Sequence, residues 1–174
     1  VLDDVIEGAD LFLGLSGPGV LTPAMVARMS SRPIVFALAN PMPEILPDQV
    51  RSVAPDAIIA TGRSDYPNQV NNVLCFPFIF RGALDVGATT INAEMELACI
   101  EGIAALARAT TSAEAAAAYH GEVLTFGADY LIPKPFDPRL IGVVASAVAK
   151  AAMETGVARR PIADMDAYRQ KLDG

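Results

Sequence analysis

A group of polar side chains at residues 61–72 offers the richest hydrogen-bonding chemistry in this sequence. Four of them are carboxamides: Asn68, Gln69, Asn71 and Asn72. A carboxamide carries hydrogen-bond donors and an acceptor on one rigid group. Asn72 stands where this loop enters the apolar segment 73–80, so the burial of that segment would fix its position. The pattern favours recognition of a small polar molecule over a simple surface turn.

Two more polar stretches each come directly after a short apolar run. The first is SGPG at residues 16–19, and the second is NPMP at residues 40–43. Gly, Pro, Asn and Asp are also ordinary turn residues, so either stretch alone is compatible with a simple turn. Three such polar stretches, each after an apolar run, indicate that the three loops form one ligand-binding site together.

The apolar runs predict the elements that position these loops. Runs at 11–15, 33–38 and 57–60 have the length of strands buried on both faces. Short helices are expected between them at 22–29 and 47–53, each with a proline in its first turn. Alternating strands and helices predict an α/β fold with a parallel sheet, and ligands bind at the carboxyl ends of such strands.

From about residue 71 onward the sequence predicts helices. The segment 73–85 is apolar nearly all round and is expected to be buried, with Pro77 in or near its first turn. Asn92 is expected to cap a helix reaching about residue 108, and Asp137 one over 138–154. An alanine-rich helix is expected at 112–119, and a short surface segment at 162–172.

Composition excludes several classes of protein. A net charge of −7 over 174 residues disfavours binding to nucleic acid or to an anionic membrane. No apolar run is long enough to span a membrane, and residues 1–4 do not resemble the start of a signal peptide. Cys75 and Cys99 are expected to be free, buried thiols in a reducing compartment, which points to the cytoplasm.

Familiar catalytic patterns are missing from the sequence. The single histidine, His120, follows an alanine-rich helix, so the sequence predicts neither a His-based triad nor a metal site of several imidazoles. Neither GxGxxG nor GxxxxGK[ST] occurs, and no carboxylate spacing singles out a metal site. The residues therefore predict no metal ligands and no phosphate-binding glycine loop.

Several longer motifs resemble the cofactor-binding domain of bacterial malic enzymes, the decarboxylating malate dehydrogenases. They are FALANP at 36–41, ATGRSDYPNQVNNV at 60–73 and FPFIFRGALD at 76–85, together with LGLSG at 13–17 and IPKPFDPR at 132–139. The resemblance covers nearly the whole chain and is greatest to the NADP-preferring type. It implies a single partial NAD(P)-binding domain over 1–174, the C-terminal half of a Rossmann-like doubly wound sheet followed by a mostly helical region.

The resemblance also implies roles for individual residues. Asn40 matches the asparagine near the nicotinamide end of NADP or NAD, and Ser16 and Gly17 match the loop beside the nicotinamide ribose. Asn72 matches the asparagine that binds the malate carboxylate, with Asn71 its neighbour. The simpler interpretations are a turn asparagine before proline for Asn40 and a helix cap for Asn72.

The family's other working parts have no counterpart in this sequence. Malic enzymes use a tyrosine acid, a lysine base and carboxylates that hold Mg²⁺ or Mn²⁺, all preceding the region that this chain resembles. The resemblance thus implies a piece without catalytic or metal-binding residues, inactive alone. Its expected partners are malate and pyruvate, the preceding half of the enzyme, further copies of itself and a phosphotransacetylase-like domain downstream.

Alternatives remain open at the level of sequence. The chain could be a noncatalytic nucleotide-sensing or assembly module, whose apolar helix at 73–84 would be partner surface. An amino-acid dehydrogenase is disfavoured by the Asn71–Asn72 pair. Arg63 and Arg81 are expected to pair with nearby aspartates, and Lys134 to be a loop residue.

Overall fold

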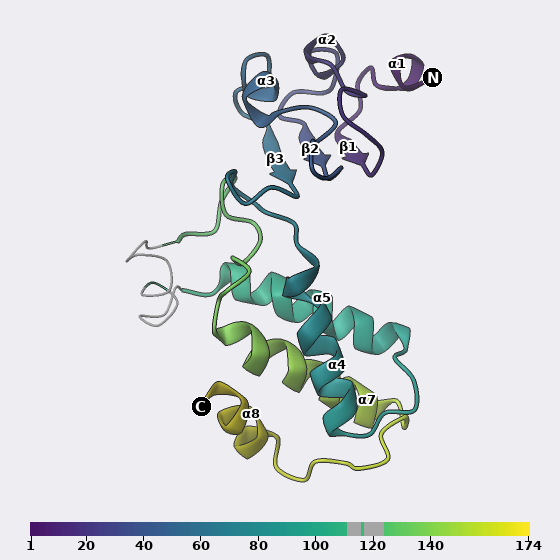
Figure 1. Ribbon diagram of the computed structural model, residues 1–174, viewed down its shortest axis with the longest axis vertical. Helices are drawn as coiled ribbons and strands as arrows, with labels where there is room; N and C mark the ends of the chain where they lie inside the picture. The colour runs from purple at the N-terminus through teal and green to yellow at the C-terminus, as the bar shows by residue number, and fades with distance from the viewer. Residues whose placement is uncertain (111–115, 117–123) are drawn as a thin grey trace. The chain divides into compact units, whose positions relative to one another are not determined.

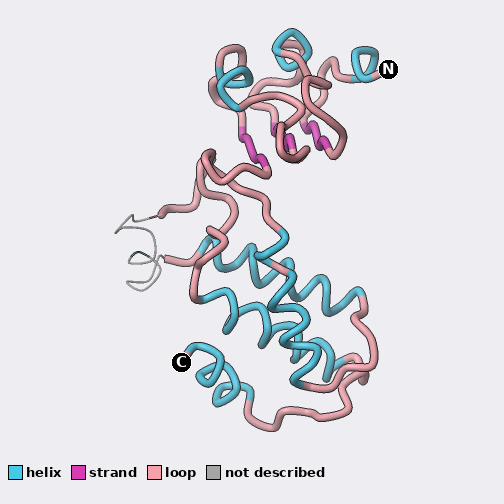
Figure 2. Tube along the Cα trace, viewed as in Figure 1, coloured by secondary structure: helices cyan, strands magenta, loops and turns pink. Residues whose placement is uncertain are grey.

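The computed structural model describes residues 1–110, 116 and 124–174. These residues form two compact units (Figures 1 and 2). The first contains residues 1–71 and 127–130, and the second contains residues 72–126 and 131–174. The helix expected at 112–119 falls, apart from residue 116, outside the described residues, as does His120.

A parallel sheet of three strands forms the centre of the first unit. The strands are β1 (Leu11–Gly14), β2 (Ile34–Ala37) and β3 (Ile58–Thr61), in that order across the sheet. Leu11 pairs with Ile34, and Ile34 with Ile58. The predicted α/β fold is confirmed, with each strand within one residue of its expected position.

Short helices precede the first strand and connect the three strands. They are α1 (Leu2–Val5), α2 (Pro23–Val26) and α3 (Pro47–Arg51). The Thr22 hydroxyl accepts a hydrogen bond from the Met25 backbone N–H at 3.3 Å, and proline opens both α2 and α3. Proline suits this position because the first helical N–H has no partner within the helix.

One face of this sheet packs against a core within its unit, and the other face is exposed at β1. Phe12, Val35 and Ile59 point to a core that also contains Val26 of α2 and Val50 of α3. Side chains alternate across a strand, so the other face carries the neighbours of these residues. On β1 these are Leu11 and Leu13, which are 52% and 56% exposed. The expectation that the strands are buried on both faces is therefore wrong for β1.

The second unit is helical, as the sequence predicts from about residue 71. Its elements are η1 (Asn72–Leu74), α4 (Phe76–Asp85), α5 (Ala93–Arg108), η2 (Ile141–Ala145), α7 (Ser146–Glu154) and α8 (Met165–Asp173). Asn92 caps α5 by accepting from the Met95 N–H at 3.0 Å. Asp137 accepts from the Arg139 N–H at 3.0 Å, but the helix predicted over 138–154 is divided into η2 and α7, and the N-cap of η2 is Leu140.

Helix α4 is buried on one side rather than all round. Its inner face consists of Ile79, Gly82 and Ala83, which pack in a core with residues of α5, η2 and α7. The opposite face bears Phe76, Phe80 and Leu84, and Phe76 and Leu84 are 65% and 67% exposed. The prediction of complete burial is wrong because apolar content alone does not show how many neighbours surround a helix.

The surface segment predicted at 162–172 forms α8, which is tied to α4 by polar contacts. The Tyr168 hydroxyl donates to the Asp85 carboxylate at 2.7 Å, and Arg81 Nε donates to the same oxygen at 2.6 Å. Asp164 caps α8 through the Ala167 N–H. No helix among the described residues has the length and apolar character needed to cross a membrane.

Candidate functional site

The loop after β1 presents Ser16 and Gly17 at the carboxyl end of the strand. Ser16 is exposed and Gly17 half-buried. No atom lies within 4 Å of the point where a Cβ on Gly17 would stand. This open space lets a ligand approach the backbone closely, as the predicted cofactor contact requires.

The loop after β2 presents Asn40, whose side chain is exposed. The Asn40–Pro41 peptide bond is cis. Asn40 lies three residues beyond the end of β2, and Ser16 two residues beyond the end of β1. Because β1 and β2 are parallel neighbours, both residues lie beyond the same edge of the sheet.

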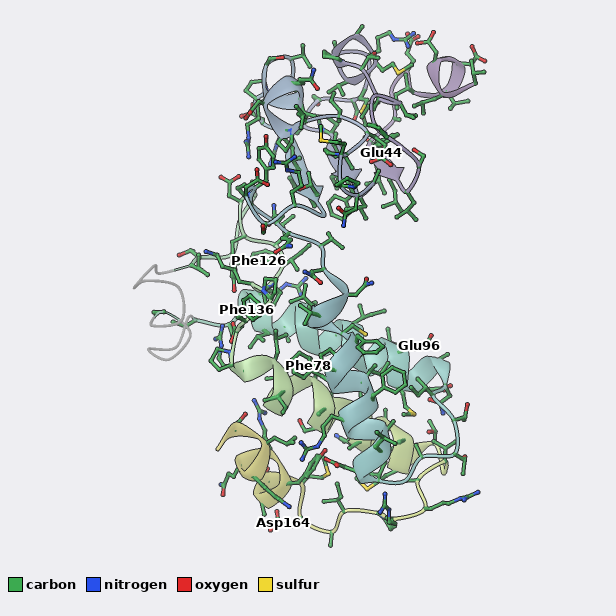
Figure 3. The ribbon with its side chains drawn as sticks, viewed as in Figure 1. Glu44, Phe78, Glu96, Phe126, Phe136 and Asp164 are labelled. Carbon is green, nitrogen blue, oxygen red and sulfur yellow. The ribbon has the colours of Figure 1, made fainter. Side chains whose placement is uncertain are left out.

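A buried carboxylate joins these two loops. Glu44 has no exposed surface and lies among the loops of the first unit (Figure 3). Its Oε1 accepts hydrogen bonds from the Ser16 backbone N–H at 2.7 Å and the Ser16 hydroxyl at 3.1 Å. Its Oε2 accepts from the Ala39 backbone N–H at 3.1 Å. One side chain therefore fixes the backbone beside both Gly17 and Asn40.

The hydrogen bonds keep this carboxylate charged. Burial raises the pKa of Glu44, but the bonds from Ser16 and Ala39 lower it by more, so the net pKa is below its usual value. The Ser16 hydroxyl gives its hydrogen to Glu44. Its oxygen is then left to accept hydrogen bonds, which suits a ligand hydroxyl and disfavours a carboxylate or phosphate oxygen.

Gly14, the last residue of β1, makes room for Glu44. A Cβ at this position would lie 2.5 Å from Glu44 Cδ and 2.7 Å from the Phe12 ring. Glu44 was not predicted as a site residue, because a carboxylate in a proline-rich loop resembles a solvated turn. Two signals were available: a glycine ending an apolar strand, and a carboxylate followed directly by the apolar pair Ile45 and Leu46.

Two of the four carboxamides after β3 stabilise their own loop. Asn68 is buried, and its Nδ2 donates to the carbonyls of Ile59 at 2.9 Å and Ala128 at 2.7 Å. Gln69 Nε2 donates to the Gly62 carbonyl at 3.3 Å. These contacts return the chain to the end of β3 and leave Asn71 and Asn72 as the ligand-binding candidates of this loop.

Asn71 and Asn72 lie at the boundary between the two units. Asn71 is half-buried and ends the main segment of the first unit, whereas Asn72 is exposed and begins η1 in the second. The alternative role of Asn72 as the cap of the following long helix is wrong, since Cys75 occupies the N-cap of α4. The structure brings Ser16, Gly17 and Asn40 together; their convergence with Asn72 stays a prediction.

The two arginines flanking this region are paired with aspartates, as expected. Arg63 contacts both Asp65 oxygens, at 2.8 and 2.7 Å, and this hydrogen bonding lowers the pKa of Asp65. Arg81 pairs with Asp85. Lys134 lies half-buried in the segment before η2.

Other potential sites lack the required chemistry. Among the residues that the structure describes, no three His, Cys, Asp or Glu side chains are grouped to hold a metal ion, so these residues do not fit a Mg²⁺ or Mn²⁺ site. A cavity of about 660 Å³ in the second unit is lined by residues including Leu106, Val143, Arg139 and Arg169. Arg139 pairs with Asp137 and Arg169 with Asp173, so both guanidinium groups in this cavity already have a carboxylate partner.

Comparisons with known proteins agree with the resemblance of the motifs. Residues 2–119 match the family "Malic enzyme, NAD binding domain". Over 171 residues the chain is 68% identical to the NADP-dependent malic enzyme of Escherichia coli (strain K12). It is 64% identical over 173 residues to the NAD-dependent malic enzyme of Rhizobium meliloti (strain 1021). These matches cover 98% and 99% of this chain but 22% of each relative.

Solved structures give the same result. The malic enzyme from Pyrococcus horikoshii superposes with a TM-score of 0.80 at 38% identity, over 98% of this chain and 36% of that one. The Entamoeba histolytica malic enzyme gives 0.82 at 34% identity, over 99% and 33%. The chain spans about 22% of the length of the two curated relatives named above, and it belongs to the malic enzyme NAD-binding domain family.

Proposed function

We propose that this chain forms part of the active site of an enzyme that oxidises malate and releases pyruvate and CO₂, with NADP or NAD as the oxidant. The single observation that best supports it is the Glu44 carboxylate, which holds the loops of Ser16 and Asn40 together at one sheet edge. Open parallel sheets bind their ligands at this edge.

The proposed roles depend on the hydrogen-bonding groups available. Ser16 and Gly17 line the nicotinamide ribose, where the acceptor oxygen of Ser16 matches a ribose hydroxyl. The exposed amide of Asn40 contacts the nicotinamide end. Asn72 donates its amide hydrogens to a malate carboxylate, and Asn71 supports it. When bound, the nicotinamide supplies the oxidation by accepting hydride from malate.

The acid, the base and the metal ligands belong to parts of the enzyme outside this chain. We expect the isolated chain, mixed with malate, NADP and Mn²⁺, to give no reduced cofactor, whereas the complete polypeptide does so. Absorbance of the reduced nicotinamide measures both. Turnover by the isolated chain would show that the catalytic groups have been misplaced.

The choice between NADP and NAD is not made by this chain. Relatives named for either cofactor are 68% and 64% identical to it. We therefore assign it a role common to both dinucleotides, at the nicotinamide end. The remaining polypeptide is its main partner, and we further propose a homo-oligomer in the cytoplasm with a phosphotransacetylase-like domain downstream.

Two substitutions in the complete enzyme separate the proposed roles. Asn40→Ala should raise KM for the dinucleotide, and Asn72→Ala should raise KM for malate. Each should change by roughly 10- to 100-fold, the worth of a hydrogen bond to a bound polar or charged group. Gln170→Ala removes an exposed carboxamide from α8 and should leave both constants unchanged. An Asn72→Ala enzyme with an unaltered KM for malate would refute that role.

A further inference from the structure

Two thiols from different helices lie in contact within the second unit. Cys75 is the N-cap of α4, and Cys99 lies in the middle of α5. Their sulfur atoms are 3.3 Å apart, and neither is in a disulfide. The sequence predicts that both are buried, but only Cys99 is; Cys75 is half-buried.

The two thiols differ in a way that orders their reactions. Cys99 is 1% exposed, so a reagent in solution meets Cys75 first. Burial, together with the hydrogen bond that Cys99 donates to Cys75, raises the pKa of Cys99 to about 12. Cys99 therefore stays protonated at neutral pH and reacts slowly. It can attack only a sulfur atom that already lies beside it.

We propose that Cys75 and Cys99 are a redox-active pair, which small-molecule disulfides such as oxidised glutathione convert to an intramolecular disulfide. The Cys75 thiolate attacks one sulfur of the reagent, forming a mixed disulfide and releasing one thiolate. Cys99 then loses its proton and attacks the Cys75 sulfur, and the second thiolate leaves. The protein loses two electrons and two protons, and the reagent is reduced to two thiols.

The geometry supports this closure. A disulfide bond measures about 2.05 Å, so the sulfurs must approach by roughly 1 Å. Cys75 lies where the short η1 turn passes into α4, whereas Cys99 is held inside a helix of 16 residues. A metal site is a poorer use of these thiols, since no third metal ligand joins them among the described side chains.

The proposal is tested on the complete polypeptide with the aromatic disulfide DTNB, followed by acid quenching and trypsin digestion. Cleavage after Arg63, Arg81 and Arg108 places Cys75 in peptide 64–81 and Cys99 in peptide 82–108. We expect these peptides to be recovered joined by a disulfide. Recovery of wild-type peptide 64–81 carrying the reagent, with Cys99 still free, would overturn the proposal.

Two variants isolate the steps. Cys99→Ser should stop at the mixed disulfide and release one thiol fewer than the wild type. Cys75→Ser should leave peptide 82–108 unmodified over the same period, because Cys99 is buried.

In the wild type, closure after the first attack should accelerate roughly tenfold per pH unit in the range below the Cys99 pKa. Labelling of Cys99 before Cys75 would contradict the assigned order. Since the wild-type peptide map is decisive by itself, the test does not depend on the variants folding.

Discussion

At the scale of single residues, Glu44 is the group on which the candidate site depends most. It offers its charge to three donors on two loops, and none of its surface reaches solvent. A buried charge is tolerated only when its hydrogen-bonding capacity is well used. The charge of Glu44 therefore depends on these three donors, and the two loops depend on the charge.

Glu44→Gln tests this arrangement. In the variant, the amide nitrogen of Gln would face a backbone N–H that now donates to a carboxylate oxygen, so two donors would meet without an acceptor. We therefore expect the free energy of unfolding at neutral pH to fall by about 2 to 3 kcal/mol. Because the folded pKa of Glu44 lies below its ordinary value of 4.5, its contribution is complete above that pH and is lost as pH falls through the folded value. The gap between wild type and variant should narrow below pH 4.5.

Urea unfolding at several pH values measures this gap. Glu101→Gln removes an exposed carboxylate of α5 and serves as the matched control, with little change expected at any pH. A Glu44→Gln protein as stable as the wild type at pH 7 would show that the carboxylate does not fix these loops.

At the scale of elements, the sequence predicted the strands well and the surroundings of α4 poorly. The strands are apolar runs bounded by glycine and proline, and this local signal is sufficient to locate them. The inner face of α4 depends instead on Gly82, against which Ala145 and Val148 pack from more than 60 positions further along the sequence. Glu44 was missed for the same reason: its burial comes from Gly14 and Ser16, about 30 residues away in sequence.

Gly82→Ala should separate α4 from its neighbours. A Cβ here would lie 2.9 Å from the Val148 Cβ and would also collide with the Ala145 carbonyl. We expect a loss of about 1 to 3 kcal/mol, typical of overpacking. Gly102→Ala in α5 is the matched control, because its nearest neighbour would be at an ordinary 3.5 Å. That change should be neutral or slightly stabilising, since Ala favours helix. Thermal unfolding distinguishes them, and equal effects would rule out a tight crossing at Gly82.

At the scale of the whole molecule, the exposed apolar surfaces are consistent with a piece of a larger protein. On the first unit they include Leu11, Leu13 and Leu15, and on α4 they include Phe76 and Leu84. Two of the predicted site residues, Asn71 and Asn72, also stand at the boundary of the two units. The sequence could identify them by motif, but convergence depends on how the complete enzyme arranges its parts.

Replacing Leu11 and Leu13 by Thr should affect the isolated chain and the complete enzyme differently. In the isolated chain it should reduce self-association, because it removes exposed apolar surface while keeping good strand formers. In the complete enzyme it should cost about 1 to 2 kcal/mol per side chain if that face is covered. Sedimentation and urea unfolding measure the two effects. Val5→Thr alters another exposed side chain, on α1, as control. An unchanged free energy of unfolding of the complete enzyme would mean that this face stays open there.

The short segment Gly127–Tyr130 belongs to the first unit although the chain on both sides of it belongs to the second. It is held there by Asn68, which donates to the Ala128 carbonyl, and by Arg51, which pairs with Asp129 at 2.7 Å. The polypeptide therefore passes from one unit to the other at 71/72, 126/127 and 130/131. A protease that cleaves the chain once, between Asn71 and Asn72, separates most of the first unit from residues 127–130, which complete that unit. For the same reason, no single truncation of the gene yields an intact copy of the first unit by itself.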